Sequence, residues 1–459
     1  MQKSMKAAAA PCSTQQARTI PFIKGNFFLG NLPAFVNNRQ GLLQRMAAQS
    51  DVIGMHVGRF PVILFNRPEH VQSILVEHAY DFTKGAYLHN IFRPVIGDGI
   101  FTSEGDLHRR QRKLMAPSFQ PRHIASYAET MGLYGEQLQQ SWEEGAVINI
   151  DRQMIGLTMS IIGKALFGAD VFTGADQLGA AMTLFSEYVA TALSRLFPIP
   201  YSIPVPTHRR TYKAIAFVRH RLQRFIDERR SHPGERNDLL SRLLEVRDED
   251  GQPMEDEQVM AECLLLFSAG HETIAAALTW SWYLLCLHPE VYTRLHQEVD
   301  GVLQGRTPTS MDLARLPYCL QVLKESMRLY PPAFAVGRKP LQESVIDGYQ
   351  VSKNSLLLIS PFTMHRRPDF YPEPERFDPE RFAPEREKML PRHAFMPFGA
   401  GPRVCIGNHF ALMEGQLLLA LLAQRVHFSL EPGQHIVPDL KRHMILRPDK
   451  AINVSVHHR

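Results

Sequence analysis

The chain contains few cysteines, and none of them is paired at a spacing that binds metal. Its 459 residues include five cysteines, an odd number, and no Cys-x-x-Cys motif. The five are Cys12, Cys263, Cys286, Cys319 and Cys405. This pattern argues against a disulfide framework and against a structural zinc site. It favours a reducing compartment, so we expect a cytoplasmic protein.

The N-terminal region lacks a long hydrophobic run. Ala7–Ala10 is too short for the apolar core of a secretory signal. Phe22–Phe35 is interrupted by Lys24 and by several Gly, Asn and Pro residues. No N-terminal stretch reaches the roughly 18 apolar residues that a membrane span needs. We therefore expect no membrane anchor, a flexible tail at residues 1–20, and a single domain at residues 21–459.

An excess of charge of one sign is also absent. The formal net charge is +5, from 51 Lys and Arg against 46 Asp and Glu. The basic residues are scattered and are not interleaved with aromatic residues, which argues against a nucleic-acid groove. No repeat, linker or low-complexity tract divides the chain, and 44% of its residues are hydrophobic, as in an ordinary globular protein. One large, mostly helical unit is the simplest prediction.

The periodicity of the sequence predicts a small sheet within a helical body. Asp51–Asn66 and Val345–Pro361 contain β-branched and apolar runs with glycines between them, which is typical of strands. These segments lie far apart in the chain, so we expect a sheet built from distant parts. Phe197–Pro206 has four prolines and predicts a rigid loop. Shorter helical patterns recur at His208–Arg230, Gln321–Leu329 and Ala411–Arg425.

The longest periodic segment runs from about Met254 to Leu287. Acidic residues stand at its start, where the helix dipole favours them, and Pro289 ends it. Apolar residues surround it on most sides, so we expect a helix that crosses the core. A membrane span is the alternative, but Glu262 and His271 near the middle argue against it.

The ten residues Phe398–Gly407 place Cys405 in a glycine-rich turn just before an apolar run. Glycines let the backbone turn tightly beneath a flat ligand and expose N–H groups around the sulfur. Such donors favour a thiolate and tune its electron donation to a bound iron. A cysteine without such neighbours would be better explained as a buried free thiol, but here all ten residues around Cys405 form one pattern.

This segment resembles the signature of the cytochrome P450 family, Phe-x-x-Gly-x-Arg-x-Cys-x-Gly. Its fixed positions are met by Phe398, Gly401, Arg403, Cys405 and Gly407. The resemblance covers about residues 21–447. It implies a P450-like α+β fold, mainly α with a small β domain, whose long central helix crosses over the haem. It also implies haem b with the Cys405 thiolate as metal ligand, contacted by Phe398, Arg403 and Gly407.

A second motif, Ala269–Thr273 with the sequence Ala-Gly-His-Glu-Thr, lies in the middle of the long helix. Ala269 and Thr273 share a face, and with Gly270 they would leave a groove for a diatomic ligand. The threonine hydroxyl can bond to the carbonyl four residues earlier. Alone, the motif is equally a polar interruption of a buried helix. It resembles the P450 oxygen-activation motif, in which Ala269 lies at the cofactor and Glu272 and Thr273 are the catalytic acid and alcohol.

A charged pair and a later arginine resemble the structural triad of the same family. Glu325 and Arg328 are three residues apart on one predicted helical face. Such a pair is usually a solvated surface pair, but its neighbours here are apolar. The resemblance adds Arg381 as the third member. We expect these three residues to support the fold and the haem, and to take no part in chemistry.

The propionates of a haem require cations at its edge, and the resembled family supplies them from three places. Arg403 precedes the cysteine by two residues, and Arg338 follows a Pro-Pro turn. His108 and Arg112 lie one helical turn apart in a basic segment. Each alone is as well explained by an exposed charge. Arginine geometry suits carboxylates, and the resemblance implies propionate contacts for all four.

The residues that line the substrate pocket are harder to predict from the sequence. Bulky apolar residues in Tyr87–Ile100 occupy the loop that caps the haem in the family, and Phe185–Leu196 could form the roof. Lys84, His89 or Arg93 could anchor a substrate carboxylate. Plain core packing is an equal alternative. The candidate pocket residues are Leu88, Ile91, Phe92, Phe267, Ala333 and Val336.

These features together predict a haem-thiolate monooxygenase that inserts one atom of O2 into a lipophilic molecule such as a fatty acid, a terpenoid or a polyketide-like compound. Electrons would come from a separate ferredoxin or flavodoxin with its reductase, docked in part on Arg109, Arg110 and Lys113. A peroxide-driven peroxygenase is the alternative within the class, although Glu272 and Thr273 favour O2. A non-catalytic haem sensor or carrier is the alternative outside it.

Overall fold

The computed structural model of the chain describes residues 18–168, 175–193, 195, 199–232, 234, 238–440 and 444–459, with the backbone alone at 175–178. Residues 1–17, which hold most of the expected tail, lie outside the described residues. So do parts of two predicted segments, the roof Phe185–Leu196 and the proline-rich loop Phe197–Pro206.

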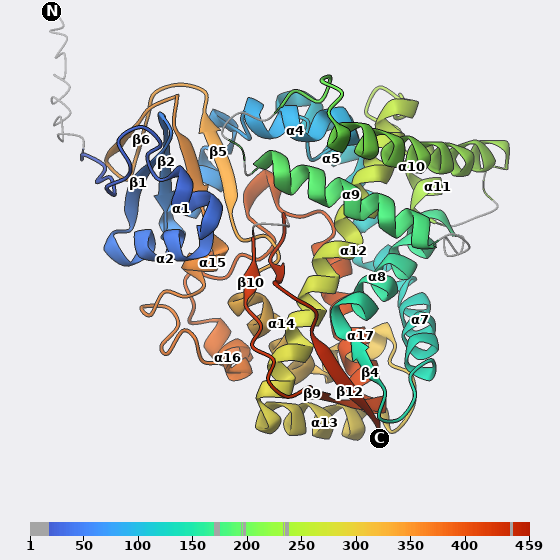
Figure 1. Cartoon of the computed structure of the whole chain (residues 1–459). Coiled ribbons are helices and arrows are strands. Elements are labelled where there is room, and N and C mark those ends of the chain that lie inside the picture. The colour runs from blue at the N-terminus through green and yellow to red at the C-terminus, as the bar shows by residue number, and fades with distance from the viewer. Residues whose placement is uncertain are drawn as a thin grey trace, which may run out of the picture.

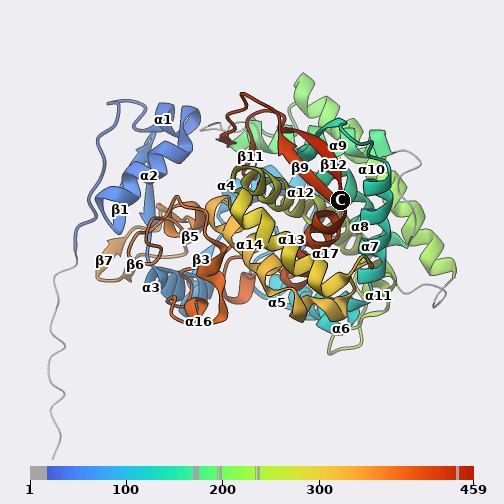
Figure 2. The same cartoon turned by 90° about the horizontal axis from the view of Figure 1, so that it is seen from below.

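A sheet-rich side and a larger helical side make up the described chain (Figures 1 and 2). The main sheet has the strand order β1-β2-β8-β5-β3. Its strands are β1 Val52–Val57, β2 Phe60–Phe65, β3 Phe82–Thr83, β5 Val336–Pro340 and β8 Leu356–Ile359. β2 and β8 pair in parallel, with Val62 opposite Leu356. This pairing confirms the prediction of a small sheet built from distant parts of the chain.

Smaller sheets complete the β structure. A three-stranded sheet joins β4 Val147–Asn149, β12 Asn453–His458 and β9 Val426–Leu430. Two-stranded pairs are formed by β6 Ser344–Ile346 with β7 Tyr349–Val351, and by β10 Pro438–Asp439 with β11 Arg447–Pro448.

Helices form most of the described chain. Those that position the site are α3 Pro68–Val71, α4 Ala86–Ile96, α5 Gly105–Met115, α8 Ile150–Phe167, α9 Ala175–Leu193, α12 Asp256–Leu287, α14 Pro317–Leu329, α15 Pro361–Met364 and α17 Asn408–Arg425. The others are α1 Leu32–Asn37, α2 Arg39–Gln49, α6 Pro121–Ala125, α7 Ala128–Gln140, α10 Pro206–Ser231, α11 Leu239–Glu245, α13 Pro289–Leu303 and α16 Pro384–Glu387, with the short helical turns η1 Gln72–Glu77, η2 Ala79–Asp81, η3 Ala116–Phe119, η4 Ser310–Arg315, η5 Pro379–Phe382 and η6 Gly401–Arg403.

The four helical patterns read from the sequence are confirmed, because each lies almost entirely within α10, α12, α14 or α17. One expectation was wrong. The sequence predicts a loop at Tyr87–Ile100, but most of this segment is the helix α4, which contains Pro94. An interior proline removes one backbone donor, and this helix tolerates it because its apolar face packs into the core through Ile91, Phe92 and Val95.

α12 crosses the middle of the helical side (Figure 1). Its length and mean hydropathy of 1.2 would allow it to span a membrane, but 67% of the apolar window is buried inside the protein. Trp280 and Trp282 are fully buried on it and belong to the largest apolar cluster. α12 is therefore a core helix, as predicted.

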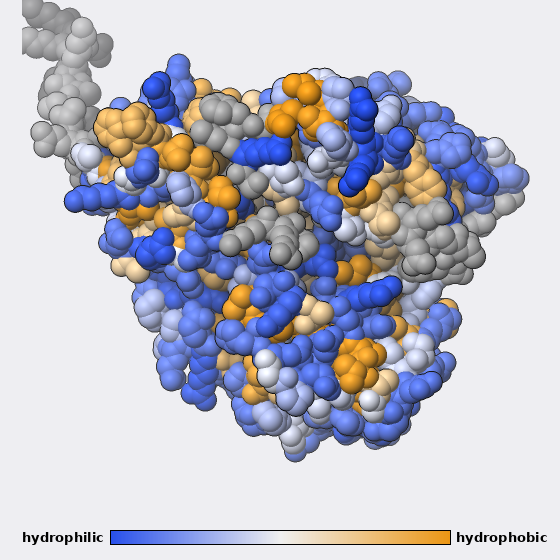
Figure 3. All heavy atoms as spheres, in the orientation of Figure 1, coloured by the Kyte–Doolittle hydropathy of each residue, from blue (hydrophilic) through white to orange (hydrophobic). Residues whose placement is uncertain are grey.

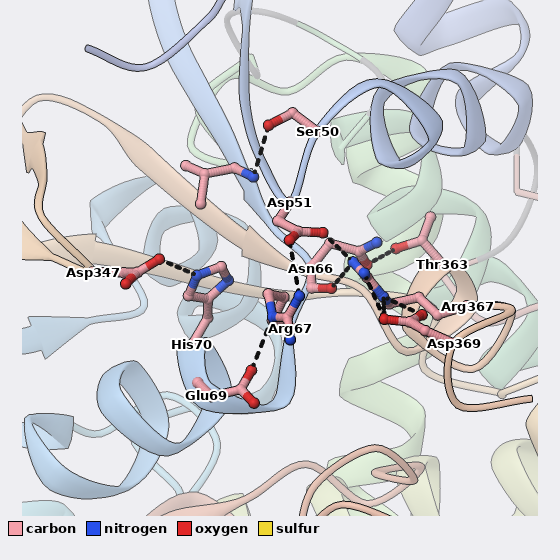
Figure 4. Close-up of polar contacts among 11 residues, drawn as sticks. Ser50, Asp51, Asn66, Arg67, Glu69, His70, Asp347, Thr363, Arg367 and Asp369 are labelled. Carbon is pink, nitrogen blue, oxygen red and sulfur yellow. Dashed lines mark hydrogen bonds and ion pairs between the residues drawn. The ribbon is translucent and has the colours of Figure 1, made fainter. Parts of the chain in front are cut away.

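A polar cluster joins the residues that flank β1 and β2 to α15 and the residues just after it (Figure 4). Asp51 accepts from Arg67 at 3.1 Å and also pairs with Arg367. Arg367 donates to the carbonyl of Asn66 at 2.8 Å, and Thr363 donates to the Asn66 side chain at 2.7 Å. Two arginines on one carboxylate hold the pKa of Asp51 below its ordinary value, although burial opposes them. The cluster fixes the sheet against the part of the chain that leads to Cys405.

Candidate active site

The Cys405 loop owes its shape to two glycines with left-handed backbone. Gly399 has φ +73° and Gly401 has φ +70°. A Cβ on Gly401 would lie 1.8 Å from the carbonyl oxygen of Leu75, so no other residue fits this close approach. The backbone N–H of Cys405 donates to the carbonyl of Phe398 at 2.9 Å, which closes the loop. This close contact explains why the sequence pattern requires glycine at position 401.

The sulfur of Cys405 is accessible, although the chain packs closely around it. The residue is exposed, whereas the other described cysteines are buried or half-buried. Burial by the surrounding chain raises the pKa of the thiol, and the backbone N–H of Gly407 and the guanidinium of Arg112 oppose this rise. A bound iron would remove the proton outright, and these two groups would then stabilise the thiolate. The backbone donor is of the kind that the glycine-rich turn predicts, whereas Arg112 was predicted only as a propionate contact.

α12 presents one open position in an otherwise buried stretch. Ala269 is exposed, while Phe267 and His271 on either side are buried. Thr273, one turn on, is half-buried and donates from its hydroxyl to the carbonyl of Ala269 at 2.9 Å. An exposed alanine in the middle of a core helix marks a hollow beside it. The predicted Ala–Thr face and the back-bonded threonine are both present.

Gly270 has a different role from the one expected. It was placed with Ala269 and Thr273 on the groove, but a Cβ at Gly270 would lie 2.9 Å from the side chain of Ile162 on α8. The glycine therefore lets α8 approach α12 closely. The hollow is bordered by Ala269 and Thr273 without it.

The carboxylate of Glu272 points towards α9 and β11. The hydroxyl of Ser186 on α9 lies 3.0 Å from each of its two oxygens. Arg447 approaches one of these oxygens at 3.6 Å and binds Asp151 at 2.6 Å. Glu272 is buried, so these contacts compensate its charge. Ser186, Arg447 and Asp151 were not anticipated, because no local pattern connects three residues on three elements.

Cations gather around one acid near the Cys405 loop, where Arg338 is buried and Lys84, Arg403 and Glu104 are half-buried. Arg338 is buried, and burial followed by repulsion from Arg403 lowers its pKa to about 10. Lys84 lies in the same cluster, where burial and then Arg403 and Arg338 lower its pKa strongly. Glu104 opposes these shifts and pairs with Arg403. The cluster therefore holds more cations than acids in a largely desolvated place, which suits an anionic ligand.

His108 and Arg112 on α5 adjoin this cluster. Burial, and then the charges of Arg403 and Lys84, lower the pKa of His108 to about 3, so this imidazole is neutral near pH 7. It would contact an anion as a neutral donor, not as a cation. Arg112 donates to the carbonyl of Val404, next to the cysteine. All four residues predicted to contact the propionates are thus brought to the same region, and Lys84, predicted as a substrate anchor, lies with them.

The structure brings the three residues of the predicted structural triad together, Glu325 and Arg328 on α14 and Arg381 on η5. Arg328 donates to the two oxygens of Glu325 at 2.6 and 2.8 Å, and both residues are fully buried. Arg381 lies 3.5 Å from Glu325. The remaining donors of Arg328 reach the carbonyls of His365 and Pro374. A buried pair needs such additional partners, and they join α14 to the segment that precedes the cysteine loop.

The predicted pocket residues lie in two kinds of surroundings. Ala333 is exposed, and Leu88 and Val336 are half-buried. Ile91, Phe92 and Phe267 are buried in the main core cluster. The ring of Phe92 lies 4.9 Å from that of Phe101 and 6.4 Å from that of Phe185. Ala333, Leu88 and Val336 are therefore the better candidates for contact with a ligand, because they are not fully buried.

The predicted carboxylate anchors are already engaged. Arg93 forms an ion pair with Asp98 at 2.7 Å. His89 contacts the carbonyl of Thr102 at 3.3 Å. Lys84 donates to the carbonyl of Phe101 and belongs to the cation cluster.

The basic segment proposed for a redox partner is also neutralised within the chain. Arg109 pairs with Asp106, Arg110 with Asp248 at 2.8 Å, and Lys113 with Glu249. Among the described residues, no group of three or more His, Cys, Asp and Glu side chains is arranged to hold a metal ion.

Known proteins resemble this chain over nearly its whole length. A family model described as Cytochrome P450 matches residues 20–456. Cyclooctatin synthase of Streptomyces melanosporofaciens is 35% identical over 86% of this chain and 87% of the relative. Pentalenene oxygenase of Streptomyces avermitilis is 30% identical over 86% of this chain and 88% of the relative. The solved structure of a retinoic acid-bound cyanobacterial CYP120A1 has a TM-score of 0.86 at 27% identity, covering 96% of this chain and all of that one.

The thiol loop, the buried cation cluster and the open face of α12 define a haem-thiolate enzyme. The family match extends over almost the whole chain, and this chain belongs to the cytochrome P450 family. It is a cytochrome P450 monooxygenase, and the cofactor of this family is haem b. The residues present fit that group, because the exposed Cys405, the excess of cations around Arg338 and the small Ala269 suit an iron, two propionates and a flat ring respectively.

Proposed function

We propose that this monooxygenase hydroxylates or epoxidises a lipophilic terpenoid with O2 and two electrons from a separate ferredoxin or flavodoxin and its reductase, in the cytoplasm. The observation that carries the proposal is the open Ala269–Thr273 face in the middle of α12, in a protein whose only exposed described cysteine is Cys405. Haem bound through a thiolate supplies O2 binding and O–O cleavage. The remaining tasks fall to the side chains around it.

Thr273 and Glu272 would hold and move the protons that this reaction consumes. The Thr273 hydroxyl donates to the carbonyl of Ala269, the exposed residue one turn earlier, so its oxygen can still accept a hydrogen bond on this part of α12. Glu272 lies next to it in sequence but is held from the other side by Ser186 and Arg447. A carboxylate in this place can take protons from the α9 side and pass them towards the hydroxyl.

The charges near the hollow favour a neutral substrate over a fatty acid. Arg93 is paired with Asp98, and Lys84 belongs to the cation cluster, so neither offers an open site to a carboxylate. Burial of apolar area at ~25 cal/mol per Å² can supply most of the affinity for a terpenoid. Relatives named cyclooctat-9-en-7-ol 5-monooxygenase, at 32% identity, and pentalenene oxygenase support the same substrate class.

The experiment is a panel of neutral cyclic terpenes and medium-to-long fatty acids added to the haem-loaded protein. Displacement of a water from the iron shifts the Soret band, so a binding substrate is seen directly. Terpenes that give a shift, where fatty acids give none, would support the proposal, and the reverse would overturn it. Product formation that needs a reduced ferredoxin and O2, and not peroxide alone, separates the monooxygenase from a peroxygenase and from a haem carrier.

A further inference from the structure

The beginning of the chain has an unusual charge balance. Residues 1–50 contain no Asp or Glu, and they contain six Lys and Arg. The remaining 409 residues hold 45 Lys and Arg against 46 Asp and Glu. The positive net charge of the protein is thus contributed by its first 50 residues, of which 18–50 are described.

The same segment exposes two phenylalanines at the tip of a tight turn. Phe27 is 92% exposed and Phe28 is 81% exposed. Asn26 and Gly30 close the turn with two backbone hydrogen bonds of 2.8 Å each. The side-chain oxygen of Asn26 accepts from the N–H of Phe28 at 2.9 Å. The aromatic tip is therefore held in place by its own backbone.

The turn is also fixed against the sheet. Gly30 has φ +55°, and a Cβ there would lie 2.2 Å from the carbonyl oxygen of His56 on β1. The N–H of Asn31 donates to the same carbonyl at 2.5 Å. Phe22 is 41% exposed nearby and stacks on His56 with a ring separation of 4.6 Å. Phe22, Phe27, Phe28 and Leu29 are all exposed in this one segment, and a contiguous exposed apolar patch, unlike a single exposed residue, indicates an interaction site.

Cations flank the aromatic tip. Lys24 and Arg45 line a groove together with Phe22, and Arg59 lines the adjacent groove together with Phe27. Within the described part of the chain, neither groove is lined by an acidic residue. The acids at this end of the sheet are already engaged, since Asp51 binds two arginines and Asp347 contacts His70 (Figure 4).

We propose that this face, the aromatic turn Asn26–Gly30 with Lys24, Arg45 and Arg59, docks the enzyme reversibly on an anionic membrane surface. Apolar spheres gather at this end of the molecule, over β1 and α1, with hydrophilic spheres between them (Figure 3). A bilayer surface offers hydrocarbon beneath a layer of phosphate, which matches protruding rings flanked by cations. Because the tip protrudes and the flanking charge is all of one sign, an anionic lipid surface fits better than a folded protein partner. The docking is independent of the substrate proposed above.

The test is co-sedimentation of the haem-loaded full chain with vesicles. Vesicles of equal parts phosphatidylglycerol and phosphatidylcholine should bind the protein, and phosphatidylcholine alone should bind it much more weakly. The double variant Phe27→Ser, Phe28→Ser should lose partition by about a hundredfold. Replacement of Lys24, Arg45 and Arg59 by Gln should cost about fivefold for each charge on the anionic vesicles. Met311→Ser, which removes an 87% exposed side chain on η4, is the matched control and should bind as the wild type does.

A second readout keeps the test independent of stability. Trp142, Trp280 and Trp282 are buried, so Phe27→Trp introduces an exposed fluorophore, whose emission should shift to the blue with anionic vesicles. Wild-type protein that stays in the supernatant, or Phe27→Ser, Phe28→Ser protein that binds as well as wild type, would overturn the proposal. Loss of binding to an acidic ferredoxin in the same variant, with no vesicle binding by the wild type, would assign the face to a protein partner instead.

Discussion

The hydroxyl of Ser186 lies 3.0 Å from both carboxylate oxygens of Glu272, the residue that precedes Thr273. This contact joins α9 to the middle of α12. Arg447, at 3.6 Å from the same carboxylate, adds a link to β11 near the C-terminus. The position of the Glu272 carboxylate therefore depends on α9 and β11, two elements far from it in sequence. A movement of either element would move this carboxylate relative to Thr273.

Ser186→Ala should uncouple electron use from product formation. The variant removes the donor that orients Glu272, so we expect a few-fold less product for each electron consumed, with more hydrogen peroxide, and unchanged substrate binding. Glu272→Gln should lower product formation by about a hundredfold, since it removes the acid itself. The measurement is the ratio of product to reductant consumed. Thr183→Ala is the control, because Thr183 is exposed on the same helix and its hydroxyl donates to the carbonyl of Gly179, one turn earlier.

Thr273→Ala should show a stronger effect of the same kind. It removes the hydroxyl that faces the hollow, so reduced oxygen should be released as peroxide while the substrate-induced Soret shift persists. Thr273→Ser retains a hydroxyl that can bond to Ala269 and should restore most of the coupling. If Thr273→Ala coupled electrons to product as well as the wild type, the hydroxyl would have no part in proton delivery.

The cation cluster predicts which residues retain the haem. Lys84→Met and Arg338→Met should each weaken haem retention by about tenfold, because each removes a charge-assisted contact in a buried place. Transfer of haem to apomyoglobin measures this rate. Lys339→Met is the control, since the exposed Lys339 lies next to Arg338 on the same strand.

The parts of this site that the sequence predicts are those fixed by local geometry. The Cys405 loop needs glycine at 401 because a backbone carbonyl lies against it, and such a requirement is visible as a motif. The Ala269–Thr273 motif is similarly local, since four residues make one helical turn. A lysine such as Lys84 has no local signature, and only the pairing of β3 with β5 brings it to Arg338.

Long-range pairing also explains why the sequence did not predict the ion pairs made by the basic residues of α5. The partner of Arg109 is three residues away, but Arg110 and Lys113 bind acids about 140 positions later, at Asp248 and Glu249. No pattern in a single sequence relates those positions. The helical conformation of α4 was missed for another reason, because an internal proline ordinarily ends a helix and tertiary packing overrides that preference here.

A buried carboxyl on α12 predicts a specific pH dependence of stability. Glu262 is fully buried, and its two oxygens accept from the N–H of Ile100 at 2.9 and 3.1 Å. Burial raises its pKa from an ordinary value of 4.5 to about 8, and the bond from Ile100 opposes this rise. The carboxyl thus fastens the segment after α4 to the central helix while it is largely protonated near pH 7.

The folded protein binds this proton more tightly than the unfolded chain, so the stabilisation is complete below about pH 4.5 and is lost as the pH rises through about 8. Glu262→Gln, a neutral isostere, should remove this dependence. Its free energy of unfolding relative to wild type should rise by up to about 3 kcal/mol between about pH 5 and about pH 8. Urea unfolding at the two pH values measures the difference. Glu257→Gln, on the exposed first turn of α12, should show no such change. A constant difference between Glu262→Gln and wild type at both pH values would mean that Glu262 is already ionised in the folded protein.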